Sequence, residues 1–363
     1  MKKRIYIRLF TTLAIFVANI PVAPAQNSDI QPAEIVIGIG ERVSFSPTPD
    51  EKPSGKWHTE NDNAAILSVK DNGTLTIIGM AEGVSSITSG KKRSISYPVR
   101  VVPKTIRILA IGNSFSEDAV QNYLYELARA EGIEIVVGNL FIGGCSLETH
   151  LANARSDAPA YSYRKIGPDG KLTTRPNTSL DEALNDESWN YISLQQVSYL
   201  AGKFSSWEKS LPQLIRHVRE KSPHTGNTTL MIHQTWAYAE NSTHKRFADY
   251  GKDQMKMYKD VVDCVSRVAR LNGIDLVIPC GTAIQNGRTS SLGDTFCRDG
   301  FHLQRTYGRD TAACTWFEKI FNRDVVENPY FPDTISEKEK RIARYAAHYA
   351  VKAPEVITDM KAF

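Results

Sequence analysis

The chain has 363 residues, of which 41% are apolar and 23% charged, a composition typical of folded globular proteins and unlike that of disordered or disulfide-scaffold chains. Its 44 Lys and Arg exceed its 40 Asp and Glu by four, and four bases (Lys2, Lys3, Arg4 and Arg8) lie within the first eight residues. The rest of the chain is therefore neutral, which argues against an electrostatic surface for nucleic acid or anionic lipid.

Residues 1–25 have the three parts of a secretory signal peptide. Basic residues at positions 2–4 precede an apolar run over 9–22, and Ala23-Pro24-Ala25 is a small-residue cleavage site. A membrane anchor is the weaker alternative, because the apolar run is short and is interrupted by an asparagine and a proline. We therefore predict an exported protein, periplasmic or extracellular, without membrane insertion.

The five cysteines form no C-x-x-C pair, and the chain has no H-E-x-x-H motif, so no zinc site is predicted from motifs. In an exported protein this odd number allows at most two disulfides. Cys280 and Cys297 are the candidates for one bridge, although the sequence does not fix the pairing.

Residues 27–103 have the pattern of short strands and contain no amphipathic helix of useful length. Strands are expected over 35–39, 43–45, 67–69, 75–78, 86–88 and 96–102, with turn-forming residues between them. The pattern predicts a small all-β sandwich. The segments 57–69, 71–76, 79–83 and 97–101 resemble a bacterial immunoglobulin-like domain of the second group, which implies a spacing or adhesion role.

From 104 to 363 the period changes to alternating strands and helices. Strands are expected over 106–111, 133–137, 191–194, 229–233 and 276–278, helices over 117–130, 207–221, 250–271 and 306–321, and an inserted hairpin over 161–176. This alternation predicts an α/β domain with a parallel sheet covered on both faces. Ligands of such sheets bind beyond the carboxyl ends of the strands.

Two segments at opposite ends of this region carry side chains suited to nucleophilic catalysis. Ser114 follows the first strand in Gly112-Asn113-Ser114, where its N–H lies near a helix N-terminus, although serine is also an ordinary helix cap. Asp299 precedes His302 by three residues, so the carboxylate can orient the imidazole, which can accept a proton from a serine.

Together, Gly112-Asn113-Ser114 and the D-x-x-H of 299–302 resemble the SGNH (GDSL-like) hydrolases. The resemblance implies a flavodoxin-like three-layer fold, with Ser114 as nucleophile, His302 as general base and Asp299 as its orienting carboxylate. It also implies an oxyanion hole made by the Ser114 N–H and by a glycine N–H after the second strand. Gly144 is favoured for that glycine over Gly143.

The family's third motif, G-x-N-D, is replaced here by Gln195-Gln196, whose Leu-Gln-Gln context resembles an uncharacterised SGNH-like branch of polysaccharide-degrading bacteria. Glutamine carries the same NH2 donor as asparagine on one more methylene. Gln196 is the first choice for the remaining oxyanion donor, and Gln195 the second.

Five residues beside these motifs are candidates for substrate binding: Asn113, Tyr199, His233, Trp236 and Tyr238. The aromatic rings follow strand ends, where they offer flat faces to a sugar ring, but the same position suits core packing. His233 is either a pocket residue or a buried hydrogen-bonded histidine.

The sequence thus predicts a secreted serine esterase that removes O-acetyl or other small acyl groups from carbohydrate without a metal or cofactor. A catalytically silent glycan-binding or adhesion protein on the same fold is the alternative. A glycosidase finds no privileged pair among the 40 acidic residues. The oligomeric state and the role of the immunoglobulin-like domain stay open.

Overall fold

The computed structural model describes residues 34–39, 42–47, 56–70, 73–89, 95–102, 105–222 and 228–363. The predicted signal peptide lies outside these residues. The chain divides into two compact units, the second of which begins at Arg107. Among the helices in the described part of the chain, none is both long enough and apolar enough to span a membrane.

The first unit has its described strands in two small sheets. One has the order β1 (Ile35–Gly38), β7 (Ile95–Val102), β6 (Gly83–Ser89) and β3 (Trp57–Thr59), and the other the order β2 (Arg42–Phe45), β5 (Leu75–Gly79) and β4 (Ala65–Val69). Strand β1 pairs parallel with β7, and the other described pairs are antiparallel.

Alternating side chains of these strands form one apolar core. Leu75 and Ile77 of β5 are buried together with Ile87 of β6 and Val99 of β7, while the residues between them are more exposed. This is the period of two that a half-buried strand requires. Six strands were expected from the sequence and are present; β3 was missed because its three residues have no apolar alternation.

The second unit is a mixed α/β fold around a seven-stranded sheet. The strand order is β11 (Leu172–Thr178), β10 (Tyr161–Ile166), β9 (Glu134–Phe141), β8 (Thr105–Gly112), β12 (Tyr191–Leu194), β13 (Thr229–His233) and β14 (Leu276–Ile278). Strands β8, β12, β13 and β14 run parallel, whereas β10 is antiparallel to both of its neighbours. The expected hairpin is confirmed as β10 and β11.

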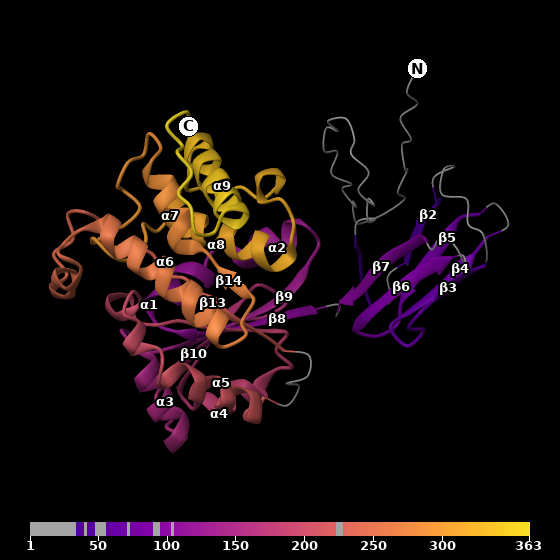
Figure 1. Ribbon diagram of the computed structural model, residues 1–363, viewed down its shortest axis with the longest axis horizontal. Helices are drawn as coiled ribbons and strands as arrows, with labels where there is room; N and C mark the ends of the chain where they lie inside the picture. The colour runs from indigo at the N-terminus through magenta and orange to yellow at the C-terminus, as the bar shows by residue number, and fades with distance from the viewer. Residues whose placement is uncertain are drawn as a thin grey trace. The chain divides into compact units, whose positions relative to one another are not determined.

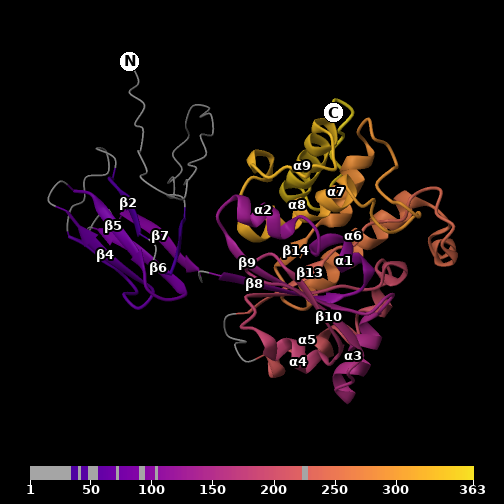
Figure 2. The ribbon, with the colours of Figure 1, turned by 180° about the vertical axis from the view of Figure 1, so that it is seen from behind.

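Helices cover both faces of this sheet, as Figure 1 and its reverse view in Figure 2 show. One layer holds α3 (Leu147–Ser156), α4 (Leu180–Asp186) and α5 (Ser210–Lys221). The other holds α1 (Ser114–Val120), α2 (Leu124–Ala130), α7 (Cys280–Arg288), α8 (Tyr307–Phe321) and α9 (Glu337–Lys352). Helix α6 (Gln254–Leu271) packs against α7 and β14. Short 3-10 turns include η1 (Ser198–Leu200), η2 (Phe204–Ser206), η4 (Lys245–Tyr250) and η5 (Val325–Glu327).

Two of the expectations about helices and disulfides fail in this unit. The single helix expected over 117–130 is two helices, because Tyr123 between them has a positive φ of 68° that no α-helix accommodates. The candidate bridge between Cys280 and Cys297 is wrong, since all five cysteines are free thiols. Cys280 is instead fully buried, with its sulfur 3.8 Å from the carbonyl of Ala312.

Candidate active site

The site forms at the carboxyl end of β8, where the chain turns into α1. Asn113 caps this helix: its backbone is extended, and its Oδ1 accepts a 3.0 Å hydrogen bond from the N–H of Phe115. A Cβ on Gly112 would lie 2.9 Å from the side chain of Gln195, so the turn requires glycine. Ser114 is thereby the first residue of α1, at the open edge of the sheet.

Ser114, His302 and Asp299 form a continuous hydrogen-bonded chain. The Ser114 Oγ is 2.9 Å from Nε2 of His302, and Nδ1 of His302 is 2.7 Å from Oδ2 of Asp299. A carboxylate only accepts, so Nδ1 carries the proton and Nε2 is left to accept from the serine hydroxyl. Ser114 and His302 are half-buried and Asp299 is exposed, so the chain is reachable from solvent.

A tight turn holds the carboxylate against the imidazole. Oδ1 of Asp299 accepts from the backbone N–H groups of Phe301 at 3.2 Å and His302 at 2.8 Å. Gly300 permits this turn with φ of 88°, at a place where a Cβ would come 2.8 Å from Cα of Ser242. Partial burial raises the pKa of Asp299, but the hydrogen bonds from His302 and the two N–H groups outweigh it, so the pKa is lowered.

A buried carboxylate on α1 holds this turn from both sides. Asp118 is 1% exposed and accepts a 2.8 Å hydrogen bond from the N–H of Leu303. It also forms ion pairs with Arg298 at 3.1 Å and Arg309 at 2.7 Å. The residues immediately before and after the 299–302 turn are therefore tied to the helix that begins with the serine. Sequence reasoning missed Asp118, because nothing local relates it to residues 180 positions away.

Near the serine, the backbone N–H groups of Ser114, Gly143 and Gly144 are among those without a hydrogen-bonding partner within the described residues. Gly144 is exposed and has φ of 64°, which favours glycine. The Nδ2 of Asn113 donates a 3.0 Å hydrogen bond to the carbonyl of Cys145. Asn113 therefore links the first turn of α1 to the turn that contains Gly144.

The prediction that Gln196 supplies a side-chain donor to the site is wrong. Its Nε2 donates to the carbonyl and hydroxyl of Ser206, and its Oε1 accepts from the N–H groups of Leu147 and Val197. Successive residues at a strand end point to opposite faces of the sheet, so Gln196 faces α3 and Gln195 faces α1. Gln196 joins the start of α3 to the loop after β12.

The second choice for the oxyanion donor, Gln195, is also wrong, because its side chain is part of a buried chain of hydrogen bonds that reaches the helix cap. Its Oε1 is 2.8 Å from Nδ1 of His233, and its Nε2 donates a 2.9 Å hydrogen bond to Oδ1 of Asn113. Burial lowers the pKa of His233 to about 3, so the ring is neutral and donates from Nδ1. Asn113 and His233 are each 1% exposed. Their predicted contact with substrate is therefore wrong.

The predicted substrate contacts of Trp236 and Tyr238 are also wrong, because both side chains are fully buried. Trp236 stacks on Phe115 with ring centroids 4.3 Å apart, and its Nε1 donates to the carbonyl of Phe301. The hydroxyl of Tyr238 is 2.8 Å from Oγ of Ser198. Packing beneath the serine, rather than ligand contact, accounts for these rings.

The partly exposed rings beside the site come from other positions. Phe301 packs on His302 with ring centroids 4.1 Å apart, and His244 meets Phe301 edge-on at 5.0 Å. Tyr199, half-buried as well, stacks on His244 at 6.1 Å. Of these three rings the sequence predicted only Tyr199. Phe301 could have been predicted as well, because it lies inside the D-x-x-H segment of 299–302.

The fold and the site together define a class of protein: a mixed α/β unit with a hydrogen-bonded Ser, His and Asp at the carboxyl edge of its sheet. The chain belongs to the DUF4886 family, described as "Domain of unknown function (DUF4886)", which residues 107–350 match. A crystal structure of a DUF4886 family protein from Bacteroides uniformis is 53% identical to it, with a TM-score of 0.69, and the alignment covers 70% of this chain and 98% of that one.

Two other solved structures are much less similar. A putative GDSL-like lipase from Parabacteroides merdae has 12% identity and a TM-score of 0.41, over 60% of this chain and 96% of that one. The acetylxylan esterase Axe2 from Geobacillus stearothermophilus has 10% identity and a TM-score of 0.38, over 60% and 93%. Similarity this weak says nothing about the activity of the present chain. No curated protein matches it.

Proposed function

We propose that this protein is a secreted serine esterase of the SGNH type, which removes O-acetyl or other small acyl groups from carbohydrate. The observation that carries the proposal is the hydrogen-bonded chain from Ser114 through His302 to Asp299. A serine, a base that takes its proton and a carboxylate that orients the base together form the arrangement needed for acyl transfer.

In the acylation half of the reaction, Oγ of Ser114 attacks the acyl carbon of the ester and its proton passes to Nε2 of His302. The tetrahedral intermediate then collapses, the bond to the leaving oxygen breaks, and that oxygen takes the proton from Nε2 as the alcohol departs. Asp299 accepts from Nδ1 throughout and stabilises the imidazolium. The product at this stage is an acyl ester on Ser114.

In the deacylation half, a water molecule attacks the acyl carbon while Nε2 of His302 takes its proton. Collapse of the second tetrahedral intermediate breaks the bond to Oγ of Ser114, which regains the proton from His302. The carboxylic acid leaves and the enzyme is restored.

The oxyanion of both intermediates is stabilised by the N–H groups of Ser114 and Gly144 in this mechanism. Removal of one such donor typically costs about 2.7 to 4 kcal/mol of transition-state stabilisation. Asn113 holds both donors, since it caps α1 and binds the carbonyl next to Gly144. Gln195 acts through Asn113, as a positioning residue.

The carbohydrate part of the proposal rests on three aromatic rings that lead away from His302. Phe301 packs on His302, His244 packs on Phe301, and Tyr199 packs on His244. Flat aromatic faces with polar edges suit the faces of a sugar ring. The signal peptide predicted from the sequence would deliver the enzyme to polymeric glycans outside the cytoplasm. The two small sheets of the first unit would be an immunoglobulin-like spacer.

Covalent labelling tests the proposal. A fluorophosphonate probe should label the purified protein, and peptide mapping should locate the adduct on Ser114. The variant His302→Asn should remain folded and lose the label, because the serine then lacks its base. A folded protein that the probe does not label would be the glycan-binding alternative.

Product analysis tests the substrate class. Incubation with acetylated xylan or another acetylated glycan should release acetate and leave the length of the glycan chain unchanged. Shortened glycan without acetate release would indicate a glycosidase and contradict the proposal.

A further inference from the structure

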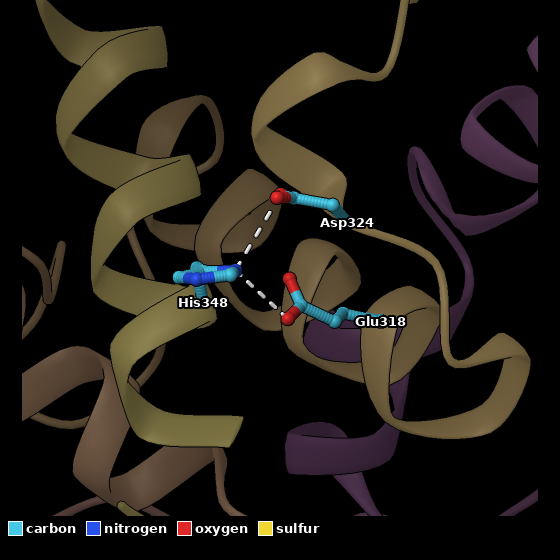
Figure 3. A group of neighbouring side chains, drawn as sticks. All are labelled: Glu318, Asp324 and His348. Carbon is cyan, nitrogen blue, oxygen red and sulfur yellow. Dashed lines mark ion pairs between the residues drawn. The ribbon is translucent and has the colours of Figure 1, made fainter. Parts of the chain in front are cut away.

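A group of three metal-ligating side chains lies away from the active site, where the end of α8 meets α9. Figure 3 shows Glu318 on α8, Asp324 in the turn that follows and His348 on α9 pointing toward one another. Each side chain offers one donor atom, and the three donor atoms lie within 4.8 Å of one another. Three separate elements thus bring an imidazole nitrogen and two carboxylate oxygens together.

The imidazole nitrogen of His348 lies within ion-pair distance of both carboxylates, as the dashed lines in Figure 3 show. Nδ1 of His348 is 2.9 Å from Oε1 of Glu318 and 3.4 Å from Oδ1 of Asp324. Apart from these two carboxylate contacts, this buried nitrogen has no hydrogen-bonding partner within the described residues. In a tetrahedral zinc site, bonds of about 2.0 to 2.2 Å separate neighbouring ligand atoms by about 3.3 to 3.6 Å. The spacing from Nδ1 to Asp324 lies in this range, and the spacing from Nδ1 to Glu318 is slightly shorter.

Both carboxylates are fixed before any ion binds. The second oxygen of Glu318 accepts from the N–H of Val325 at 3.2 Å, and Asp324 accepts from the N–H of Val326 at 2.9 Å. Hydrogen bonds of this kind orient metal ligands. The side chain of Glu318 is 3% exposed, so its charge requires a positive partner, whereas that of Asp324 is 52% exposed and leaves a path to solvent.

We propose that Glu318, Asp324 and His348 bind one divalent cation of the zinc type per chain, with water completing the coordination. A neutral imidazole and two carboxylates carry two negative charges, which a divalent ion balances, and this mixed nitrogen and oxygen set suits zinc rather than calcium or magnesium. The ion would hold α9 against the end of α8. The proposal is independent of the esterase chemistry, because none of the three residues belongs to that site.

Calorimetric titration of the full chain with zinc chloride tests this site. The wild type should bind one zinc per chain with saturation, and zinc should raise its Tm. His348→Gln and Glu318→Gln should each weaken this binding at least about tenfold. His217→Gln is the matched control: its ring lies beside a carboxylate, that of Asp181, outside the group, so the variant should bind zinc as the wild type does.

Cobalt substitution keeps the test decisive if a variant folds poorly. The wild type with Co²⁺ should show ligand-field absorption without a band from thiolate to cobalt. A thiolate band would show that a free cysteine binds the metal, and it would overturn the proposal. The proposal also fails if the folded wild type binds no zinc, or if folded His348→Gln and Glu318→Gln keep the wild-type affinity.

Discussion

Asn113 is the residue on which the geometry around the serine depends most. Its Oδ1 accepts from the N–H of Phe115 and from the amide of Gln195, and its Nδ2 donates to the carbonyl of Cys145. All of these groups are buried, so each needs its partner. The orientation of one amide therefore sets the positions of both backbone donors proposed for the oxyanion.

Replacement of Gln195 tests this role. Gln195→Leu removes one donor to Asn113 and leaves Nδ1 of His233 without its acceptor. We expect kcat on p-nitrophenyl acetate to fall about 100-fold, because small displacements of catalytic groups cost that much, while KM stays nearly unchanged. Steady-state kinetics of the purified variant measure both constants.

Gln196→Leu is the control for this variant. It removes the hydrogen bonds to Ser206 and to the start of α3, so Tm should fall while kcat of the folded protein stays near that of the wild type. The opposite result, with kcat lost in Gln196→Leu and retained in Gln195→Leu, would restore the choice made from the sequence.

At this scale the sequence predicts residue types well and their directions poorly. Ser114, Asp299 and His302 lie in short motifs whose residue types and spacing suit the reaction, and the structure brings them together. The two glutamines differ by one position, and only the register of the strand decides which one faces the serine. For Trp236, an aromatic ring after a strand suits core and ligand equally, and tertiary packing decides.

Between elements, Asp118 joins α1 to the turn that carries His302. Asp118→Asn keeps the shape of the side chain and its contact with the Leu303 N–H but removes the charge that faces Arg298 and Arg309. We expect the free energy of unfolding to fall by about 3 kcal/mol, as when one partner of a buried ion pair is lost. We also expect kcat to fall although no proposed catalytic group changes. Urea unfolding and kinetics measure the two effects.

The partly exposed ion pair of Arg323 with Glu131 provides the comparison, since both of its side chains reach solvent. Arg323→Met should cost less than about 1 kcal/mol and leave kcat unchanged. Equal effects of Asp118→Asn and Arg323→Met on the free energy of unfolding and on kcat would contradict this role of Asp118.

A second buried carboxylate, Asp310 in the first turn of α8, gives a dependence of stability on pH. Burial raises its pKa to about 7, against the opposing charge of Arg344, whereas the ordinary value is 3.8. The folded state therefore binds this proton more tightly than the unfolded state. Its contribution to stability is fully present below pH 3.8 and is lost as the pH rises through about 7.

Asp310→Asn should therefore stabilise the protein at pH 8, on the order of 4 kcal/mol in the free energy of unfolding, because no buried charge forms. The difference from the wild type should shrink as the pH falls to 4. Denaturant unfolding at the two pH values measures it. An asparagine variant that is less stable than the wild type at pH 8 would contradict this role of burial.

Helix-capping residues could have predicted two helices that the hydrophobic period did not. The capping boxes of Ser179 with Glu182 and of Ser336 with Glu339 were readable signals for α4 and α9, although neither helix was predicted. Helix α7 offers no such signal, because it has no side-chain cap and its polar residues Thr282, Gln285 and Asn286 are buried together with its apolar ones. The break at Tyr123 has no helix-breaking glycine or proline to announce it in the sequence.

At the scale of the whole molecule, every residue of the proposed mechanism lies in the unit that begins at Arg107. A chain shortened to begin at Thr105, the first residue of β8, should keep kcat/KM on p-nitrophenyl acetate within about twofold of the full chain, as expected for a self-contained domain. A loss of activity in the shortened chain, when circular dichroism shows it folded, would mean that the first unit contributes to catalysis.

The change of hydrophobic period near residue 104 is readable in sequence because strands and helices bury side chains at different intervals. The order of the strands in the sheet cannot be predicted in this way. Nothing local in β9, β10 and β11 indicates that they extend one side of the sheet beyond β8, and this pairing depends on contacts between distant residues.

The central claim is that the hydroxyl of Ser114 is the nucleophile, and hydrolysis of p-nitrophenyl acetate by wild type and Ser114→Ala tests it most directly. The account predicts turnover by the wild type and a loss of at least about 1,000-fold in the variant, with the fold unchanged. A Ser114→Ala protein that hydrolyses the ester as fast as the wild type would contradict it.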